Sequence, residues 1–394
     1  MLSLSFPRRT WTEIDLDALR HNYDLIRARL KPATKLCCVI KANGYGHGAV
    51  MLAKYYEAWG ADYFAVSGIT EALQLRRSGI SRPVVILGYT PPECAKNLAD
   101  NNVSQALFSE DYAAALSAQA QKAGVTVKVH CKIDTGMGRI GFRCTPNEKD
   151  DLPKALASLK LPNLYPEGIF MHFCVADGGE ETETFTKEQY ASFRYAVDFL
   201  EQSGIKFEVR HCANSAAIED YPDFQFDMVR VGIILYGLKP SDEIRNAPAF
   251  RPAMTLKTVI SHIKTLEAGD TVGYGRTYTV PAKTKIATLP IGYADGFYRQ
   301  NAKNGVKVWV NGKPCPIVGR ICMDQTMIDL GEDSDLACGE EAVIFGGGDG
   351  VPTADDIAAA DGTIGYEIVC AVSNRVPRVY KRGGEIVDVQ DGLM

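Results

Sequence analysis

The stretch LCCVIKANGYGHG, residues 36–48, places one lysine directly after a short apolar run and ahead of three glycines. An ammonium group is seldom buried without a partner, because its desolvation is costly. Lys41 therefore admits three interpretations: a strand-end lysine whose head group reaches water, a phosphate-loop lysine, or a lysine whose lowered pKa frees the amine to attack a carbonyl carbon. A phosphate-loop lysine follows its glycine spacer, whereas Gly44, Gly46 and Gly48 come after Lys41.

Other polar residues stand at or near the ends of later apolar runs. They are Lys132 and Asp134, then Arg139, His172, His211, Ser215 and Arg230. A histidine whose ring is hydrogen-bonded to a neighbour is common in a barrel lining, so no single residue of this set indicates a functional site. If the runs are barrel strands, however, their C-terminal ends open on one site. So many polar strand ends together favour a shared functional site.

A metal-dependent hydrolase is one alternative for lysines and histidines on barrel strands. That site needs a His-x-His pair on the first strand and an aspartate on the last. The first run here offers Lys41, and the last offers Arg230, which cannot release its proton and would repel a divalent ion. No metal site is predicted.

A Schiff-base lysine beside a phosphate site is the better combination. Ser215 offers a hydroxyl after the seventh run, and Gly232 with Ile233 offers backbone N–H groups after the eighth, where barrels often bind phosphate. A reactive lysine with a phosphate cradle predicts pyridoxal phosphate, PLP. A cofactor-free aldolase would share the lysine but would not need a second domain.

The first 240 residues alternate between short apolar runs and longer helical patterns. The runs are 36–43, 63–68, 83–89, 104–109, 125–134, 165–174, 207–214 and 226–237. Helices are predicted over 15–30, with Asp15 as N-cap, and over 185–204, ending on Gly204. Strands alternating with helices imply right-handed βα units. Eight of them predict an α/β fold with a closed (β/α)₈ barrel.

After about residue 250 the pattern changes to strand-like runs broken by Gly, Asn-Gly and Pro turns. Within 308–318, VWVNGKPCPIV predicts a hairpin with a two-residue Asn-Gly turn. We therefore expect a PLP-binding barrel over 12–247 and a mainly β domain over 248–394, with residues 1–11 packed against the β domain.

Composition restricts the class of partner and the location. A net charge of −5, with no basic run, argues against nucleic-acid binding. No apolar stretch is long enough to span a bilayer, and the opening MLSLSFPRRTW lacks the pattern of a signal peptide. The 11 cysteines form no CxxC pair and lie mostly in apolar runs, which favours reduced thiols and a cytoplasmic location.

Seven motifs, taken together, closely resemble those of bacterial alanine racemases over nearly the whole chain. They are TWTEIDLDALRHN, IKANGYGHG, KIDTGMGRIGF, VRVGIILYG, VGYGRTYT, IGYADG and GRICMDQ. The resemblance implies a PLP-dependent homodimer of fold type III with shared active sites. It also implies interconversion of L-alanine and D-alanine, which would supply D-alanine for peptidoglycan.

The same resemblance assigns roles to individual positions. Those implied for the cofactor are Lys41 as the Schiff-base lysine, Arg230 on the pyridine nitrogen with His172 behind it, and Tyr45, Ser215, Gly232, Ile233 and Tyr366 at the phosphate. Those implied for the substrate are Lys41 and Tyr274 of the partner chain as opposed bases, and Arg139 and Met323 at the carboxylate. Lys132 matches a position that is carbamylated in some members, and Gly365 stands where many relatives carry Asn.

Racemisation needs a base on each face of a planar carbanion, and a shallow electron sink limits side reactions. Arg230 would donate to the ring nitrogen and leave it neutral. PLP-dependent basic amino-acid decarboxylases share the two-domain plan but pair that nitrogen with an acid, so they form the main alternative. A serine-preferring racemase is a further one, since hydrophobic pockets reject an added hydroxyl poorly.

Overall fold

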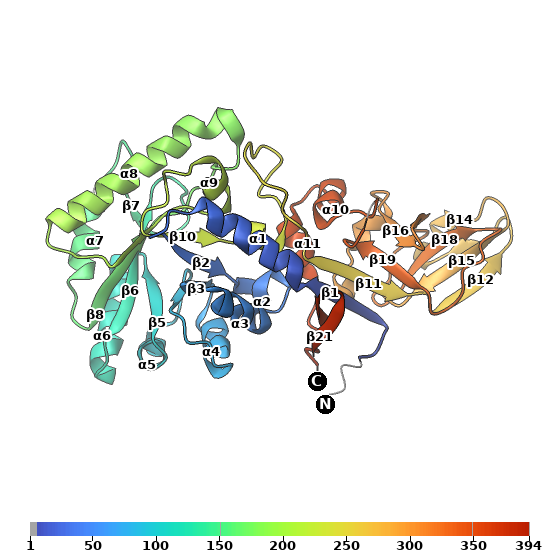
Figure 1. Ribbon diagram of the computed structural model, residues 1–394, viewed down its shortest axis with the longest axis horizontal. Coiled ribbons are helices and arrows are strands. Elements are labelled where there is room, and N and C mark those ends of the chain that lie inside the picture. Colours follow the sequence, from blue (N-terminus) through green and yellow to red (C-terminus); the bar gives the residue numbers. More distant parts are fainter. Residues whose placement is uncertain (1–5, 150, 349, 394) are drawn as a thin grey trace.

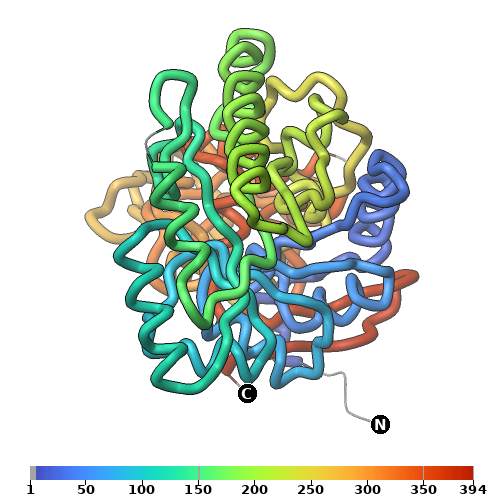
Figure 2. The backbone as a smooth tube through the Cα atoms, turned by 90° about the vertical axis from the view of Figure 1, so that its left-hand side faces the viewer, coloured from blue at the N-terminus to red at the C-terminus, as the bar shows by residue number. Residues whose placement is uncertain are grey.

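The computed structural model describes residues 6–149, 151–348 and 350–393 of the chain. Figure 1 shows two parts next to each other, a helix-wrapped barrel at the left and a mainly β part at the right. In Figure 2 the barrel faces the viewer, and the long green helix Glu183–Gln202 stands in front of the orange C-terminal part. No helix in the described ranges combines the length and the apolar character needed to cross a membrane.

Within the described residues, eight parallel strands form the barrel. They are β2 (Lys35–Val39), β3 (Tyr63–Val66), β4 (Val84–Ile86), β5 (Val103–Leu107), β6 (Val127–Asp134), β8 (Leu164–Phe170), β9 (Val209–His211) and β10 (Met228–Val231). Their order is β5-β4-β3-β2-β10-β9-β8-β6, and pairing of β5 with β6 closes the ring. Each strand falls within or overlaps a predicted apolar run, and the prediction of a closed (β/α)₈ barrel is confirmed.

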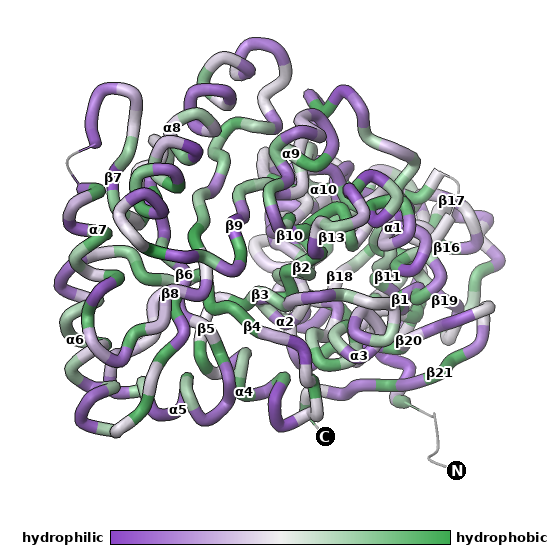
Figure 3. The backbone as a smooth tube through the Cα atoms, turned by 60° about the vertical axis from the view of Figure 1, so that its left-hand side comes forward, coloured by the Kyte–Doolittle hydropathy of each residue, from purple (hydrophilic) through white to green (hydrophobic). Residues whose placement is uncertain are grey.

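Helices pack around the outside of the barrel. The main ones are α1 (Leu16–Arg29), α3 (Ala49–Trp59), α4 (Ile69–Arg77), α5 (Ala95–Asp100), α6 (Glu110–Ala123), α7 (Leu152–Leu159), α8 (Glu183–Gln202) and α9 (Ser215–Asp220). Asp15 caps α1 as predicted, because its side chain accepts from Asp17 N and Ala18 N. Helix α8 has Ser203 as its C-cap, and the predicted Gly204 follows as the left-handed residue with φ +93°. Figure 3 shows many hydrophilic positions along α8, on the outside of the barrel.

A seven-stranded sheet forms the centre of the second part, in the order β17-β16-β19-β11-β1-β20-β21. Its strands are β1 (Thr10–Asp15), β11 (Met254–Val259), β16 (Lys307–Val310), β17 (Lys313–Pro316), β19 (Glu341–Phe345), β20 (Arg378–Arg382) and β21 (Glu385–Gln390). The N-terminal strand β1 pairs antiparallel with β11 and parallel with β20. The sequence pattern did not predict this pairing between the two ends of the chain.

Smaller elements complete this part. They are a sheet of β12 (His262–Leu266), β15 (Thr284–Leu289) and β18 (Thr326–Gly331), a ribbon of β13 (Thr271–Val272) and β14 (Tyr278–Thr279), and helices α10 (Ala354–Asp361) and α11 (Gly365–Ala371). The predicted hairpin is β16–β17, with Val310 opposite Lys313. Asn311 and Gly312 have φ of +47° and +73°, the positive pair that a type I′ turn requires.

Candidate active site

Lys41 stands where β2 ends, at the start of a left-handed turn. Ala42, Asn43, Gly44 and Tyr45 all have φ between +51° and +64°. A left-handed conformation costs roughly 1–2 kcal/mol for each residue that carries a Cβ. Strain of this kind persists where the surroundings over-determine it, most often at functional sites. The turn therefore fixes the direction in which the chain leaves Lys41.

Two glycines of the same segment allow the second part of the molecule to approach this turn. A Cβ on Gly46 would lie 2.1 Å from the carbonyl oxygen of Val369 in α11. A Cβ on Gly48 would lie 1.8 Å from the hydroxyl of Tyr380 in β20. Both have positive φ, +80° and +98°. The glycine spacing after Lys41 thus serves close packing between the barrel and the C-terminal elements, as well as the turn.

A cavity of about 820 Å³ lies at the C-terminal ends of the barrel strands. Its lining brings together most of the residues that the sequence singled out. They are Lys41, Tyr45, Lys132, Arg139, His172, Ser215, Arg230, Gly232, Ile233 and Tyr366. The volume is within the range typical of small-molecule sites.

The two lysines in the cavity have lowered pKa values. Burial, followed by the nearby charge of Arg139, lowers the pKa of Lys41 from its ordinary value. Burial lowers the pKa of Lys132 to about 7, against the opposing effect of Asp134. The Lys132 ammonium also donates to the carbonyl of Ile133 at 2.7 Å. Both amines are thus shifted toward the neutral, nucleophilic form.

Arg230 is a buried cation of the site, with 3% of its surface exposed. Its Nη1 group donates to Nδ1 of His211 at 2.9 Å and to the carbonyl of His211 at 3.1 Å. Its Nη2 group donates to the carbonyls of Met171 and Cys212, at 2.7 and 3.1 Å, and lies 3.2 Å from Nδ1 of His172. The remaining donor, Nε–H, has no acceptor within the described residues.

Burial lowers the pKa of Arg230 to about 10, so the guanidinium stays charged at neutral pH. Burial and then the charge of Arg230 hold the pKa values of His172 and His211 well below their usual range. Both imidazoles are therefore neutral and can accept from the guanidinium. The arrangement keeps a fixed positive charge beside the cavity, and none of the hydrogen bonds of Arg230 in the described part of the chain goes to a carboxylate.

Hydroxyl groups collect at another part of the cavity. Ser215 accepts from the backbone N–H of Gly232 at 3.0 Å. A Cβ on Gly232 would lie 2.9 Å from the hydroxyl of Tyr45, so glycine lets the strand end approach this ring. The rings of Tyr45 and Tyr366 are 6.0 Å apart, and neither hydroxyl has a partner within the described chain. These free donors and backbone groups suit an anion such as a phosphate.

Tyr366 lies in α11 directly after Gly365, the position at which the sequence departs from the family pattern. A Cβ on Gly365 would lie 2.0 Å from Oδ1 of Asp355. The other oxygen of Asp355 accepts from Lys239 N at 3.2 Å. Asp355 thus occupies the space that a larger side chain at position 365 would need. The difference from the family pattern at Gly365 remains local to this segment.

Tyr274 and Met323 do not line the cavity. Both lie in the second part of the chain, with 70% and 53% of their surfaces exposed. The Met323 N–H group has no acceptor within the described residues, whereas its carbonyl accepts from Ala294 N at 3.1 Å. A Cβ on Gly292 would lie within 2.4 Å of the Cys322 and Met323 carbonyl oxygens, so two backbones are in close contact here.

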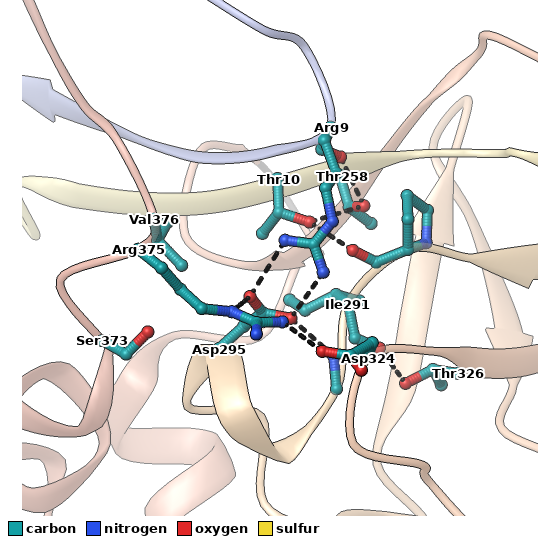
Figure 4. A network of polar contacts seen from close by, with 12 residues as sticks. Arg9, Thr10, Thr258, Ile291, Asp295, Asp324, Thr326, Ser373, Arg375 and Val376 are labelled. Carbon is teal, nitrogen blue, oxygen red and sulfur yellow. Dashed lines mark hydrogen bonds and ion pairs between the residues drawn. The ribbon is translucent and has the colours of Figure 1, made fainter. Parts of the chain in front are cut away.

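An ion network around the buried carboxylate of Asp295 supports the two turns that carry Gly292 and Met323 (Figure 4). Asp295 is fully buried and receives both Nη groups of Arg9, at 3.1 and 3.2 Å, and Nε of Arg375 at 2.7 Å. Arg375 also donates to Asp324 at 2.5 Å. Asp324 directly follows Met323 in the chain. Its contact with Arg375 therefore connects the turn that carries the Met323 N–H group to the buried Asp295.

The sequence interpretation missed several residues. Cys370 and Phe170 line the cavity, and His130 and Glu167 support it from within the barrel. The strand of residues 127–134 carried a usable signal for His130, because polar residues alternate with apolar ones along it. Glu167 gave no such signal, because a β-bulge in β8 shifts the inward-facing positions.

Comparison with known proteins identifies the same two-part organisation. The family model "Alanine racemase, N-terminal domain" matches residues 14–240, and "Alanine racemase, C-terminal domain" matches residues 253–380. The alanine racemase of Desulfovibrio desulfuricans is 48% identical over 377 residues, covering 96% of this chain and 99% of that protein.

Two solved structures with bound small molecules are similar over nearly the whole chain. The alanine racemase of Clostridium difficile 630 in complex with cycloserine has a TM-score of 0.91 and 40% identity, covering 99% of this chain and 100% of that one. The alanine racemase of Bacillus anthracis with bound L-Ala-P has a TM-score of 0.92 and 39% identity, covering 99% of each chain.

Proposed function

The chain belongs to the alanine racemase family, and from that premise we propose how it interconverts L-alanine and D-alanine. It is an enzyme whose small-molecule partner is an amino acid. The observation that carries the proposal is the cavity in which Lys41 and Arg230 lie together, with no carboxylate among the hydrogen-bond partners of the arginine in the described residues.

We propose PLP as the cofactor, because the residues of the cavity fit it. Lys41 would hold it covalently, its shifted amine suited to a carbonyl carbon. The unpaired Nε–H of Arg230 would donate to the ring nitrogen, with His172 behind the guanidinium. Tyr45, Ser215, Gly232, Ile233 and Tyr366 would surround the phosphate. When bound, PLP supplies an electron sink that acidifies the Cα–H bond of the amino acid.

Two bases would then move the Cα proton. Lys41 lies on the barrel side of the cavity, and burial favours its neutral form. Tyr274 lies outside the cavity of its own chain and is 70% exposed. A tyrosine supplied by a second copy would meet the substrate on the face opposite Lys41. We therefore propose a homodimer with two shared active sites.

The substrate carboxylate would bind between two donors. Arg139 lines the cavity and is exposed, and the backbone N–H of Met323 has no acceptor in the described part of the chain. Met323 would arrive with Tyr274 from the partner chain. Lys132, whose pKa of about 7 leaves much of its amine neutral, is suited to carbamylation. The carbamate would place a negative charge near Arg139 and orient it.

A basic amino-acid decarboxylase is not favoured, since both family models and the relatives are alanine racemases. Serine remains the alternative substrate, because it differs from alanine by one hydroxyl.

We further propose a cytoplasmic role in supplying D-alanine for peptidoglycan. The eleven cysteines support this location, as all of them are free thiols. We propose a division into a barrel over 12–247 and a mainly β domain over 248–394. Strand β1 (Thr10–Asp15) joins the sheet of the latter, and residues 1–5 of the predicted N-terminal segment lie outside the described residues.

The test is a direct assay on purified protein. L-alanine, L-serine and L-lysine are incubated separately, the products are resolved by chiral chromatography, and released CO₂ is measured. We expect D-alanine to form fastest, with no CO₂ from lysine and no activity in Lys41→Ala. The protein with PLP bound should be yellow, and borohydride treatment should leave a pyridoxyl group on Lys41. Labelling of Lys132 instead, or CO₂ release, would refute the assignment.

A further inference from the structure

A column of polar side chains runs through the barrel interior beneath Arg230. Interiors of eight-stranded barrels are usually filled by branched apolar residues. Here Nε2 of His211 lies 2.8 Å from Nδ1 of His130, and Nε2 of His130 lies 3.0 Å from Oε2 of Glu167. All three side chains are at most 2% exposed. The column therefore connects the guanidinium at the cavity to a carboxylate deep in the barrel.

Glu167 is ionised at the far end of this column. Burial alone would raise the pKa of Glu167, but hydrogen bonds from His130, Ser104 and Lys128 lower it below its ordinary value. Ser104 donates to Oε2, and the ammonium of Lys128 lies 2.9 Å from Oε1. A buried carboxylate with this set of donors keeps its negative charge across the physiological range.

The two ends of the column allow only one arrangement of protons. A guanidinium can only donate, so Nδ1 of His211 must accept from Arg230 and its Nε2 must carry the hydrogen. That hydrogen is donated to Nδ1 of His130, so His130 is protonated on Nε2 and donates to Glu167. Both imidazoles are then neutral, and each of their four ring nitrogens has a partner.

The local backbone is shaped to make room for this column. The pairing of β6 with β8 shifts register between Val129 and His130, which places Glu167 in a bulge between Pro166 and Gly168. Bulges re-aim side chains in this way. A Cβ on Gly168 would lie 2.5 Å from Nδ1 of His130, so only glycine leaves space for the imidazole. Phe170 stacks on His211, with ring centres 5.0 Å apart.

We propose that Glu167 and His130 are positioning residues for Arg230. The carboxylate fixes both histidines in one tautomeric order, and that order presents an unprotonated Nδ1 of His211 to the guanidinium. Both Nη groups are thereby held, and Nε–H is left for the ring nitrogen of PLP. Only this last step rests on the proposed function; the order of the protons is a property of the chain itself.

The first test measures the tautomers directly. The chain contains six histidines, so ¹⁵N-histidine labelling of the full-length protein gives few signals, which His130→Asn and His211→Asn assign. We expect His130 and His211 to be neutral and protonated on Nε2, with or without PLP bound. A His211 ring protonated on Nδ1, or a charged His130, would overturn the proposal. The measurement needs no racemase activity, so failure of the proposed function would not affect it.

The second test compares Glu167→Gln with Lys128→Met. Glutamine keeps the size of Glu167 but has one acceptor oxygen, too few for His130, Ser104 and Lys128 together. Lys128→Met removes one donor and leaves the carboxylate and its contact with His130. We expect Glu167→Gln to change the His211 nitrogen signals and to lower kcat about tenfold, with the KM for L-alanine little changed. Lys128→Met should leave both readouts near wild type.

Equal effects in the two variants would contradict the proposal, as would a folded Glu167→Gln protein in which neither readout changes. If the glutamine variant does not fold, the nitrogen signals of the wild-type chain still decide the matter.

Discussion

Arg375 reaches the fully buried carboxylate of Asp295 through an Nε–Oδ1 contact of 2.7 Å. The same guanidinium contacts Asp324, the residue after Met323 (Figure 4). One side chain therefore ties an exposed turn to an interior anchor. On the proposed function, that turn carries the backbone donor for the substrate carboxylate, so a change at Arg375 should weaken substrate binding without touching the reacting atoms.

Replacing Arg375 with methionine should raise the KM for L-alanine about tenfold and change kcat much less, because the Met323 turn loses its tether while Arg9 still pairs with Asp295. Steady-state kinetics provide the check. Arg8→Met is the matched control, since Arg8 contacts Glu341 in an exposed pair that contributes little. An unchanged KM in Arg375→Met would show that the turn holds its position without this contact.

Lys132 should react with CO₂ in a manner that depends on pH. Only the neutral amine adds CO₂, and burial sets the pKa of Lys132 at about 7. The carbamate should therefore be scarce below that pH and increase as the pH rises through it. ¹³C-bicarbonate NMR measures the signal directly. Lys132→Met should abolish it and Lys41→Met should not; a signal that survives in Lys132→Met would assign it to another amine.

Changing Arg230 to glutamate should divert the reaction. An acid beside the ring nitrogen would favour its protonation and deepen the electron sink that Arg230 keeps shallow. We expect racemisation to fall at least about tenfold while pyruvate formation from alanine rises. Pyruvate and D-alanine are measured in the same reaction. Normal racemisation without added pyruvate would remove Arg230 from this role.

Gly46 gives a prediction about stability. Gly46→Ala forces a Cβ toward the Val369 carbonyl at a φ of +80°, and should cost about 3 kcal/mol or more. Gly79 has a similar φ of +86° with nothing within 4 Å of its Cβ position. Gly79→Ala should therefore cost only the conformational part, about 1–2 kcal/mol. Urea unfolding compares the two; equal losses would mean that the close approach at Gly46 is easily relieved.

The sequence predicted the barrel because its strands are buried on both faces and form continuous apolar runs separated by amphipathic helices. Strand-end position then brought Lys41, Lys132, His172 and Arg230 to one cavity, as the structure shows. Features that depend on distant pairing were not predictable in this way. The pairing of β1 between β11 and β20 joins opposite ends of the chain.

The hydrogen-bonded residues behind Arg230 could not be predicted from sequence patterns either. The bulge at Glu167 breaks the alternation from which an inward-facing residue is inferred. Gly168 owes its identity to the ring of His130, a neighbour 38 positions earlier in the chain. Contacts of this kind follow from packing, and local propensity does not encode them.

On the proposed function, Lys41 and Tyr274 of different chains form one active site. Lys41 lines the cavity, and Tyr274 is exposed outside the cavity of its own chain. The direct measurement mixes and reassociates Lys41→Ala chains with Tyr274→Phe chains in equal amounts. In a mixed dimer one site collects both changes, and the other has an intact lysine and an intact tyrosine. Half the dimers should be mixed, so activity should recover to about one quarter of wild type. If heterodimers form and no activity returns, both bases belong to one chain and the shared-site account is contradicted.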